Sequence, residues 1–372
     1  MKLLLLAGEE SGVMYAERIA AAVRSRVSSV EIRGYGDYGF RTEDLGIMGF
    51  LEVFKKILYF LRVKRTMERA IDEWKPDVVC TVDYPGLNLK LAAYAKCRGI
   101  RAVHVVCPQV WAWKKGRIPK IEAALDKLCC FFPFEPALFV PGFAEFVGHP
   151  LVDEFEKVEK VERVERVEKV EGVERPQKTL AVLPGSRMGE IEKHMPVLLA
   201  VVEKLQREIP DLKVIIPAAN DRAYAAITSR TSQTSRTSQT FRVTRGGARE
   251  ALREADAAVV ASGTATLEAA LAGCPTVLVY KVGWLFALIA RVVIRGIRHV
   301  GLANILAERA GLPCPMPELL QEDFTAEKVL AAVRPFLADP VVNAASRQSL
   351  GDTMKLLRSD GGAIARIAEC LV

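Results

Sequence analysis

The sequence lacks the paired ligand motifs of zinc-binding domains: it contains no Cys-x-x-Cys pair, and its 372 residues include only four histidines. Its eight cysteines are scattered and mostly lie in apolar stretches, as free buried thiols do in a reducing compartment. No dense block of lysine and arginine accompanies the net charge of +7, so composition gives no sign of nucleic-acid binding. A phosphorylated small molecule or an anionic membrane face would suit this charge, and an ordinary solvated surface would also account for it.

Long uninterrupted hydrophobic runs are also missing. The apolar part of the N-terminal segment MKLLLLAGEESG is shorter than the core of a signal peptide and is followed by two glutamates. The segment 277–294 is the best candidate for a membrane span, but Lys281 and Arg291 interrupt it and leave too few uncharged residues to cross a bilayer. We therefore expect a protein that is soluble or lies on a membrane surface.

Short apolar runs instead alternate with helical patterns along most of the chain. Because runs that are apolar at every position suit strands buried on both faces, the alternation predicts doubly wound parallel α/β sheets. The series occurs twice, which predicts two Rossmann-like domains, and a helical tail follows them. The expected strands are 2–7, 30–34, 78–82, 102–106, 127–131, 179–183, 213–217, 241–244, 257–261 and 276–280.

The predicted boundaries follow from two tandem repeats and from changes in pattern. The first domain spans 1–152, and a charged repeat with valine at every third position makes 153–178 a solvated insertion or linker. The second domain spans 179–325, and helices in 326–372 are expected to pack back across both domains. A polar repeat at 228–240 is expected to be a flexible loop.

Two corners in the second domain suit an anionic ligand. In the segment 259–275, VVASGTATLEAALAGCP, an apolar run meets a helix at Ser262–Thr266, where free backbone N–H groups and the positive end of a helix dipole are expected. The segment 179–196 has the same layout around Pro184–Arg187, and its arginine offers two parallel donors to a diphosphate. Ordinary helix capping is the alternative, but two such corners in one domain favour phosphate binding.

The predicted strand ends of the first domain carry carboxylates, an amide and tryptophans. Asp83 follows the expected strand 78–82, so it is a candidate general base in the ligand crevice of such a fold, or only a helix cap. Glu9 lies at the first strand-to-helix turn, where it either accepts from sugar hydroxyls or compensates the helix dipole. Gln109 and Trp111 precede three cations, a composition that suits a sugar phosphate, although tryptophans more often pack in a core.

Several segments together resemble lipid-A-disaccharide synthases, which are glycosyltransferases of the GT-B type. The matching segments cover nearly the whole chain outside the two repeats, and their combination is far more specific than any one of them. In chain order they are AGEESG, GIMGFLEVFKKI, VDYPGLNLKLA, VVCPQVWAWKKGR, CFFPFEPALF, FVGHPLVDE, LAVLPGSRMGEI, ASGTATLEAALAGCPTVLVYK and VGLANILAERAGLPCPMPELLQ.

The resemblance implies two domains facing across a cleft, and a sugar transfer that needs no metal and no cofactor. A UDP-activated 2,3-diacylglucosamine would donate its sugar to the 6-hydroxyl of 2,3-diacylglucosamine 1-phosphate with inversion, giving a β-1,6 disaccharide 1-phosphate and UDP. The UDP side would comprise Gly185, Ser186, Arg187, Ser262, Gly263, Thr264, Thr266, Glu268, Asn304, Glu318 and Gln321. The acceptor side would comprise Ser11, Gly12, Asn88, Gln109 and Trp111, with Asp83, Arg187 and Glu9 as catalytic candidates.

One departure from the family pattern keeps rival functions open. The family's first turn reads GEASGD, whereas this chain reads GEESGV, so Val13 replaces one carboxylate and Glu10 adds another. The alternatives are another GT-B transferase that uses UDP-sugars, a UDP-sugar epimerase, or a UDP-binding scaffold that has lost catalysis.

The acylated substrates imply contact with a bilayer, so the expected partners are the two substrates, an anionic membrane surface and a second copy of the chain, but no nucleic acid. The segment 55–69, KKILYFLRVKRTMER, interleaves apolar and basic residues as interfacial helices do, and 284–298 is a second candidate. Packing in a core is the alternative for both segments. The resemblance places the protein in the cytoplasm, on the inner membrane face.

Overall fold

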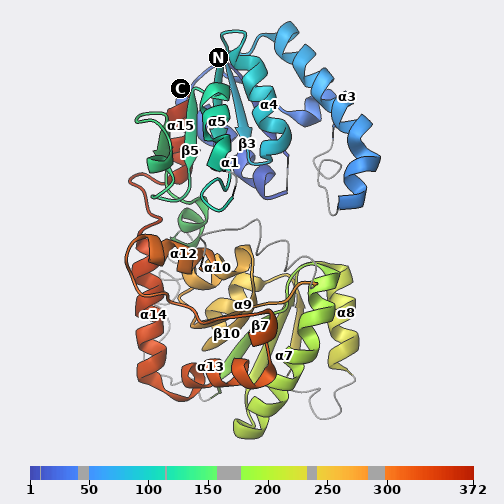
Figure 1. Ribbon diagram of the computed structural model, residues 1–372, viewed down its shortest axis with the longest axis vertical. Coiled ribbons are helices and arrows are strands. Elements are labelled where there is room, and N and C mark those ends of the chain that lie inside the picture. Colours follow the sequence, from blue (N-terminus) through green and yellow to red (C-terminus); the bar gives the residue numbers. More distant parts are fainter. Residues whose placement is uncertain (9, 41–49, 114, 157–176, 233–240, 284–297) are drawn as a thin grey trace. The chain divides into compact units, whose positions relative to one another are not determined.

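The computed structural model describes residues 1–8, 10–40, 50–113, 115–156, 177–232, 241–283 and 298–372 (Figure 1). The chain forms two compact units, each built around one six-stranded parallel sheet. The first unit comprises Met1–Asp153 and Leu357–Val372, and the second comprises Glu154–Leu356, so the chain passes between them twice. The predicted fold class, two Rossmann-like α/β sheets, is confirmed.

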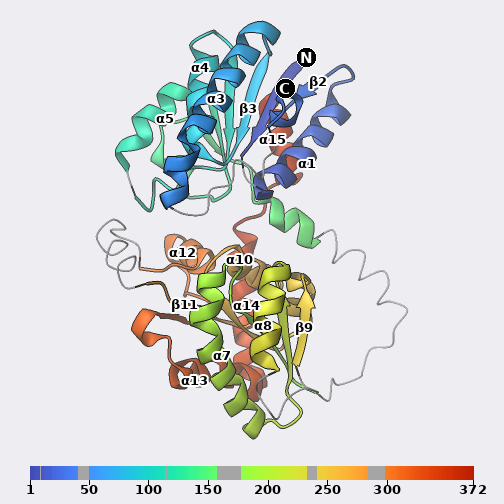
Figure 2. The ribbon, with the colours of Figure 1, turned by 90° about the vertical axis from the view of Figure 1, so that its right-hand side faces the viewer.

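The first sheet has the strand order β2-β1-β3-β4-β5-β6. Its strands are β1 (Lys2–Ala7), β2 (Glu31–Arg33), β3 (Val78–Val82), β4 (Arg101–Val105), β5 (Lys127–Cys130) and β6 (Ala144–Phe146). Because strand side chains alternate, Leu3 and Leu5 pack under α1 (Glu10–Arg26) and α15 (Ala363–Leu371), whereas Leu4 and Leu6 face the opposite helices. These opposite helices are α3 (Phe50–Trp74), α4 (Pro85–Lys96) and α5 (Ile118–Ala124), and Figure 2 shows the two layers on either side of the sheet.

The second sheet has the strand order β12-β11-β10-β7-β8-β9. Its strands are β7 (Thr179–Leu183), β8 (Lys213–Ala218), β9 (Phe241–Arg245), β10 (Ala257–Ala261), β11 (Thr276–Tyr280) and β12 (Glu318–Leu320). One face is covered by α7 (Met188–Glu208), α8 (Asp221–Thr231) and α13 (Ala326–Ala338), which share one apolar core with the strands. The remaining described helices of this unit, which contact one another, are α9 (Ala248–Glu254), α10 (Thr264–Leu271), α12 (Leu302–Arg309) and α14 (Pro340–Lys355).

Both sheets change direction beside their first strand. In the first unit the chain adds β2 on one side of β1 and then β3 on the other. In the second it adds β8 and β9 on one side of β7 and then returns to place β10 on the other. At such a switch point the connections leave on opposite faces and open a crevice at the carboxyl ends of the strands, where ligands of this architecture bind.

Two strands were missed by the sequence analysis. β6 and β12 are three residues long and only half-buried, so they carry no apolar run that distinguishes them from loops. The prediction of a loop at 228–240 was wrong for the first residues of this polar repeat, because α8 continues to Thr231. Hydroxyls in that stretch donate back to the helix, for example Ser232 Oγ to the Thr228 carbonyl at 2.6 Å. Most of the valine repeat, the apolar segment 284–297 and residues 233–240 lie outside the described residues.

Candidate functional site

A hollow of about 320 Å³ lies at the switch point of the second sheet, between the ends of β7 and β10, and is called the β7–β10 hollow below. The two corners predicted to bind phosphate meet in it, since Arg187 and Gly263 both line it. Its lining is Leu183, Gly185, Ser186, Arg187, Glu190, Pro217, Ala218, Ala219, Gly246, Ala248, Ala261, Ser262, Gly263, Thr264, Ala265 and Glu268.

The turn after β7 depends on glycine and on a carboxylate that the sequence analysis missed. Gly185 has φ +109°, and a Cβ there would lie 2.4 Å from Glu190 Oε2. Glu190 accepts from the Arg187 backbone N–H at 3.3 Å and from its guanidinium Nη1 at 3.0 Å. The Arg187 side chain is still 67% exposed, so its other donors are available to a ligand. The signal for Glu190 was its position three residues after the helix-capping residue.

A buried histidine holds the turn after β7 in place through hydrogen bonds to backbone groups. His194 on α7 is fully buried, and its Nδ1 lies 2.7 Å from the Pro184 carbonyl, while its Nε2 accepts from the Lys281 backbone N–H at 3.0 Å. Nδ1 therefore carries the proton. Burial lowers the pKa of His194, which keeps the ring neutral and both bonds in place.

The turn after β10 exposes backbone to the hollow. Gly263 caps α10 with φ +154°, makes no side-chain capping bond, and has open space where a Cβ would lie. The Thr266 N–H donates to the Gly263 carbonyl at 3.1 Å, whereas the N–H groups of Thr264 and Ala265 precede the first intrahelical bond and have no helical carbonyl to bond. Thr266, also predicted to bind UDP, is buried, and its Oγ1 donates to the Gly263 carbonyl at 2.7 Å, so its side chain closes the turn.

Two of the residues predicted near the C-terminal end of the second sheet, Asn304 and Glu318, form a separate network. Asn304 is buried and bonds both the N–H and the carbonyl of Met316, at 3.0 and 2.8 Å. Glu318 accepts from Asn304 Nδ2 at 2.8 Å and from the N–H groups of Val300 and Gly301 at the start of α12. Gln321 follows β12 at the carboxyl edge of the sheet with φ +53°. None of Asn304, Glu318 and Gln321 lines the β7–β10 hollow.

At the switch point of the first sheet, the backbone is strained. Asp83 and Tyr84, directly after β3, have φ +49° and +50°, and Val106 after β4 has φ +78°. Such conformations are costly for residues with a Cβ and gather at functional sites. Burial raises the pKa of the Asp83 carboxyl, and the hydrogen bond from the Tyr84 N–H to Oδ1 at 2.8 Å partly offsets this rise.

Asn88 holds this strained turn. It is fully buried, and its Nδ2 lies within hydrogen-bond distance of the Asp83, Val82 and Leu6 carbonyls, at 2.8, 3.1 and 3.3 Å. Its Oδ1 accepts from the Tyr35 hydroxyl at 2.7 Å. The side chain predicted to contact the acceptor is thus fully engaged inside the protein.

The remaining acceptor-side predictions divide by exposure. Gln109 is exposed, whereas Trp111 is buried and donates its indole Nε1 to Glu135 Oε1 at 3.1 Å. Gly12 is buried in α1, and Val13 packs against the apolar cluster beneath that helix. Glu9 and the Ser11 side chain lie outside the described residues.

Glu135 belongs to a buried cluster with Cys107 and Cys130 whose ligand atoms lie within 4.8 Å of one another. Its second oxygen accepts from the Phe132 N–H at 3.1 Å, so both carboxylate oxygens already have protein donors. Desolvation raises the pKa of Glu135 to about 8, and the bonds from Phe132 and Trp111 work against that rise. We therefore assign Glu135 the role of anchoring the loop that carries Gln109 and Trp111.

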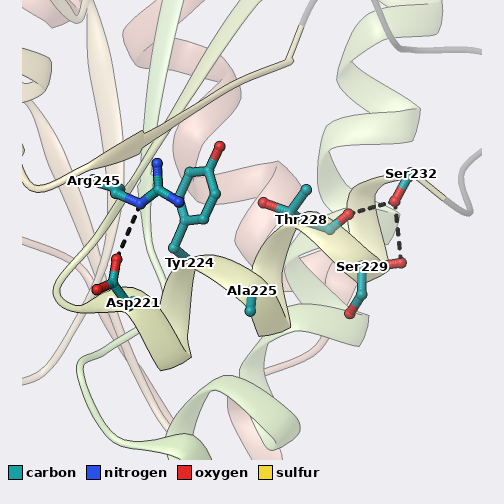
Figure 3. Close-up of a pocket in the computed structure, with 7 residues that line it drawn as sticks. All are labelled: Asp221, Tyr224, Ala225, Thr228, Ser229, Ser232 and Arg245. Atoms are coloured by element: carbon teal, nitrogen blue, oxygen red, sulfur yellow. Dashed lines mark hydrogen bonds and ion pairs between the residues drawn. The ribbon is translucent and has the colours of Figure 1, made fainter.

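A second hollow lies on α8 and β9 and contains no predicted residue (Figure 3). Arg245 lies over the Tyr224 ring at 4.1 Å and donates to Asp221 at 3.0 Å. The hydroxyls of Ser229 and Ser232 donate to carbonyls of their own helix. Most of its polar groups are thus bonded within the second unit, as is typical of a helix surface, whereas the buried Thr228 Oγ1 has no hydrogen-bond partner among the described residues.

The helix predicted to lie at a membrane interface has two distinct faces in its described part. Val63, Met67 and Ile71 of α3 are buried in the core of the first unit, as the core-packing alternative requires. Leu58 and Leu61 are 80% and 44% exposed beside basic residues. Among the described helices, none combines the length and apolarity needed to cross a bilayer.

Comparison with known proteins gives a consistent result. Residues 3–359 match the family model described as lipid-A-disaccharide synthetase. The chain is 33% identical to the lipid-A-disaccharide synthase of Syntrophus aciditrophicus over 371 residues, covering 97% of this chain and 94% of the relative. It is also 33% identical to the enzyme of the same name from Myxococcus xanthus, covering 100% of this chain and 97% of the relative.

Solved structures that resemble the chain are more distant. An S. aureus MnaA-UDP co-structure has a TM-score of 0.63 at 13% identity, covering 98% of this chain and 94% of that one. The glycotransferase of kitacinnamycin has a TM-score of 0.63 at 13% identity, covering 99% of this chain and 97% of that one. At these identities the likeness shows the fold, which is that of GT-B glycosyltransferases.

Proposed function

The chain belongs to the lipid-A-disaccharide synthetase family and is a glycosyltransferase, and on this premise we propose its substrates and the roles of its residues. The donor is UDP-2,3-diacylglucosamine, and the acceptor is 2,3-diacylglucosamine 1-phosphate. The acceptor 6-hydroxyl attacks the anomeric carbon of the donor, the bond from that carbon to the diphosphate oxygen breaks, and UDP leaves. The product is the β-1,6 disaccharide 1-phosphate.

The single observation that carries the donor assignment is that both anion-binding corners line the β7–β10 hollow. There, the exposed donors of Arg187 and the first N–H groups of α10 face the developing negative charge of the diphosphate. Fixed donors of this kind act without reorganising during the reaction, and removing one typically lowers kcat by about 10²–10³-fold. Glu268, which lines the same hollow, is proposed to accept from the ribose hydroxyls.

On the acceptor side, Asp83 is the proposed general base that takes the proton of the attacking hydroxyl. Its position at a strained switch point and its raised pKa support this role, because a base works best when its pKa approaches the working pH. Gln109 is proposed to contact the acceptor directly. Asn88 and Trp111 are proposed as positioning residues, since their polar groups are bound inside the protein.

We propose that the protein works in the cytoplasm at the inner membrane face and that the exposed side of α3 rests on the bilayer. Leu58 and Leu61 would enter the headgroup region, and Arg62 and Arg65, both exposed, would face anionic lipid. The acyl chains of both substrates require such contact.

The donor and acceptor roles are tested by a transfer assay with both acylated sugars, paired with titration of UDP by calorimetry. Arg187→Ala should weaken UDP binding and lower the transfer rate by about 10²-fold or more. Asp83→Asn should lower the rate by about 10²-fold while UDP affinity stays unchanged. Arg207→Ala is the matched control, because Arg207 lies on α7, the helix that Arg187 caps, and pairs with Glu203 at 2.6 Å.

The outcomes separate the rival functions. Absence of disaccharide phosphate from the wild type with authentic substrates would refute the proposed reaction. A wild type that binds UDP but transfers no sugar, together with a Val13→Asp variant that regains transfer, would instead indicate a scaffold that has lost catalysis. Formation of an epimer of the sugar without acceptor would favour an epimerase.

A further inference from the structure

Arg249, on α9, holds two carboxylates that lie far apart in the sequence. Its Nε donates to Glu268 Oε1 at 2.8 Å, and its Nη1 donates to Glu154 Oε2 at 2.5 Å. Both carboxylates are only 17% exposed. Phe155, which is buried, lies 5.5 Å from the guanidinium carbon. No motif in the sequence marks Arg249, because it lies in a charge-rich helix.

Arg249 links the hollow to the beginning of the second unit. Glu268 lines the β7–β10 hollow, and Glu154 is the first residue of that unit. Two carboxylates that share one guanidinium would repel each other without it, and one of them would turn away. Hydrogen bonds to Glu268 and Glu154 raise the pKa of Arg249 although burial acts to lower it. The guanidinium therefore holds both carboxylates in place.

We propose that Arg249 is a positioning residue that fixes the Glu268 carboxylate for recognition of a ribose diol. This inference rests on the proposed nucleotide site. Arg249 donates to Oε1 of Glu268, and among the described residues Oε2 has no donor, so this oxygen of a residue that lines the β7–β10 hollow can accept from a ligand hydroxyl. A buried acceptor of this kind discriminates strongly against a ligand that lacks the hydroxyl, because the acceptor then stays unpaired.

The test compares the affinities of UDP and 2′-deoxy-UDP by calorimetry. We expect the wild type to bind UDP about tenfold more tightly than 2′-deoxy-UDP, as for a hydrogen bond to a charged group. Arg249→Ala should bring the two affinities to within about threefold of each other, and Glu268→Ala should do the same. Arg253→Ala is the matched control, because Arg253 lies over the same Phe155 ring at 5.0 Å, and it should keep the wild-type ratio.

Each result has one meaning. If the wild type binds no UDP, the proposed function fails and not the role of Arg249. If UDP binds but the wild type does not discriminate, or if Arg249→Ala weakens both ligands equally and keeps the ratio, the positioning role is refuted. Should Arg249→Ala fail to fold, Arg249→Lys, which keeps the charge but not the forked geometry, should give an intermediate ratio at an unchanged melting temperature.

Discussion

Glu135 offers a quantitative test of the buried anchor beneath the Trp111 loop. Its side chain is 2% exposed and its pKa is raised to about 8, compared with 4.5 for an ordinary glutamate. Between these two values the folded state binds more protons than the unfolded state, so stability must fall as pH rises through this window. From pH 5 to pH 8.5, linkage gives a loss of about 4 kcal/mol from this group alone.

The perturbation is Glu135→Gln, which mimics the protonated form. At pH 5 the variant should be less stable than the wild type by about 1 kcal/mol, since an amide N–H₂ replaces one of two acceptors. At pH 8.5 it should be more stable by about 3 kcal/mol, because the buried charge is gone. Urea unfolding followed by tryptophan fluorescence suits this test, since Trp74, Trp111 and Trp113 all lie in the first unit.

The control for Glu135 is Glu122→Gln. Glu122 also accepts a backbone N–H, from Val140 at 2.9 Å, but at the protein surface, so its variant should follow the pH dependence of the wild type. Taking the difference between variant and wild type removes the contributions of other titrating groups. A Glu135→Gln variant that parallels the wild type from pH 5 to pH 8.5 would refute the reasoning.

Three further substitutions test other parts of the structure. His104 is fully buried and its pKa is lowered to about 3, so the free energy of unfolding falls as pH drops below 6.5. His104→Asn should reduce the difference in unfolding free energy between pH 7 and pH 5 by about 2 kcal/mol, as measured by urea unfolding. Gly185→Ala, which adds a Cβ at φ +109° and 2.4 Å from a carboxylate oxygen, should destabilise the second unit by about 1–3 kcal/mol and weaken UDP binding in calorimetry, whereas Gly189→Ala, with open space around it, should do neither. Gly8→Ala would place a Cβ 2.6 Å from Tyr84 Cγ, so it should lower the transfer rate at least about tenfold while leaving UDP affinity unchanged.

The sequence predicted the scaffold well because parallel strands buried on both faces are apolar at every position. Runs such as 78–82 and 257–261 are fully buried strands in the structure. The two corners predicted to bind phosphate do meet in one hollow, while their role in binding stays a prediction. β6 and β12 escaped because short half-buried strands depend on their neighbours in the sheet rather than on their own residues.

The sequence could not show which polar residues at these corners face a ligand. Asn88, Thr266 and Asn304 all lie in the predicted segments, yet each donates a side-chain hydrogen bond to a backbone carbonyl of the protein. Closing a tight turn and binding a ligand call for the same donors and acceptors, so the residue type is identical for both roles. Arg249 shows the converse: its partner Glu154 is distant in the chain, and only the fold brings them together.

The two switch points are built by different means, and this difference leads to a last prediction. The turns after β7 and β10 use glycines at 185 and 263, which adopt unusual φ values at little cost, whereas the turn after β3 holds Asp83 and Tyr84 in left-handed conformations that cost energy. Asn88 supplies the compensating bonds, so Asn88→Ala should destabilise the first unit by about 2–4 kcal/mol and release Asp83 from its position.

In the folded Asn88→Ala protein the transfer rate should fall at least about tenfold while UDP affinity stays at the wild-type value, as measured by the transfer assay and calorimetry below the melting temperature. Tyr35→Phe is the control, because it removes the hydroxyl that donates to Asn88 Oδ1 at 2.7 Å but leaves the bonds to the strained turn. It should cost about 1 kcal/mol of stability and keep the rate within about twofold. If Asn88→Ala transfers sugar at the full rate, the left-handed turn is not what orients Asp83, and the case for Asp83 as the base loses its structural support.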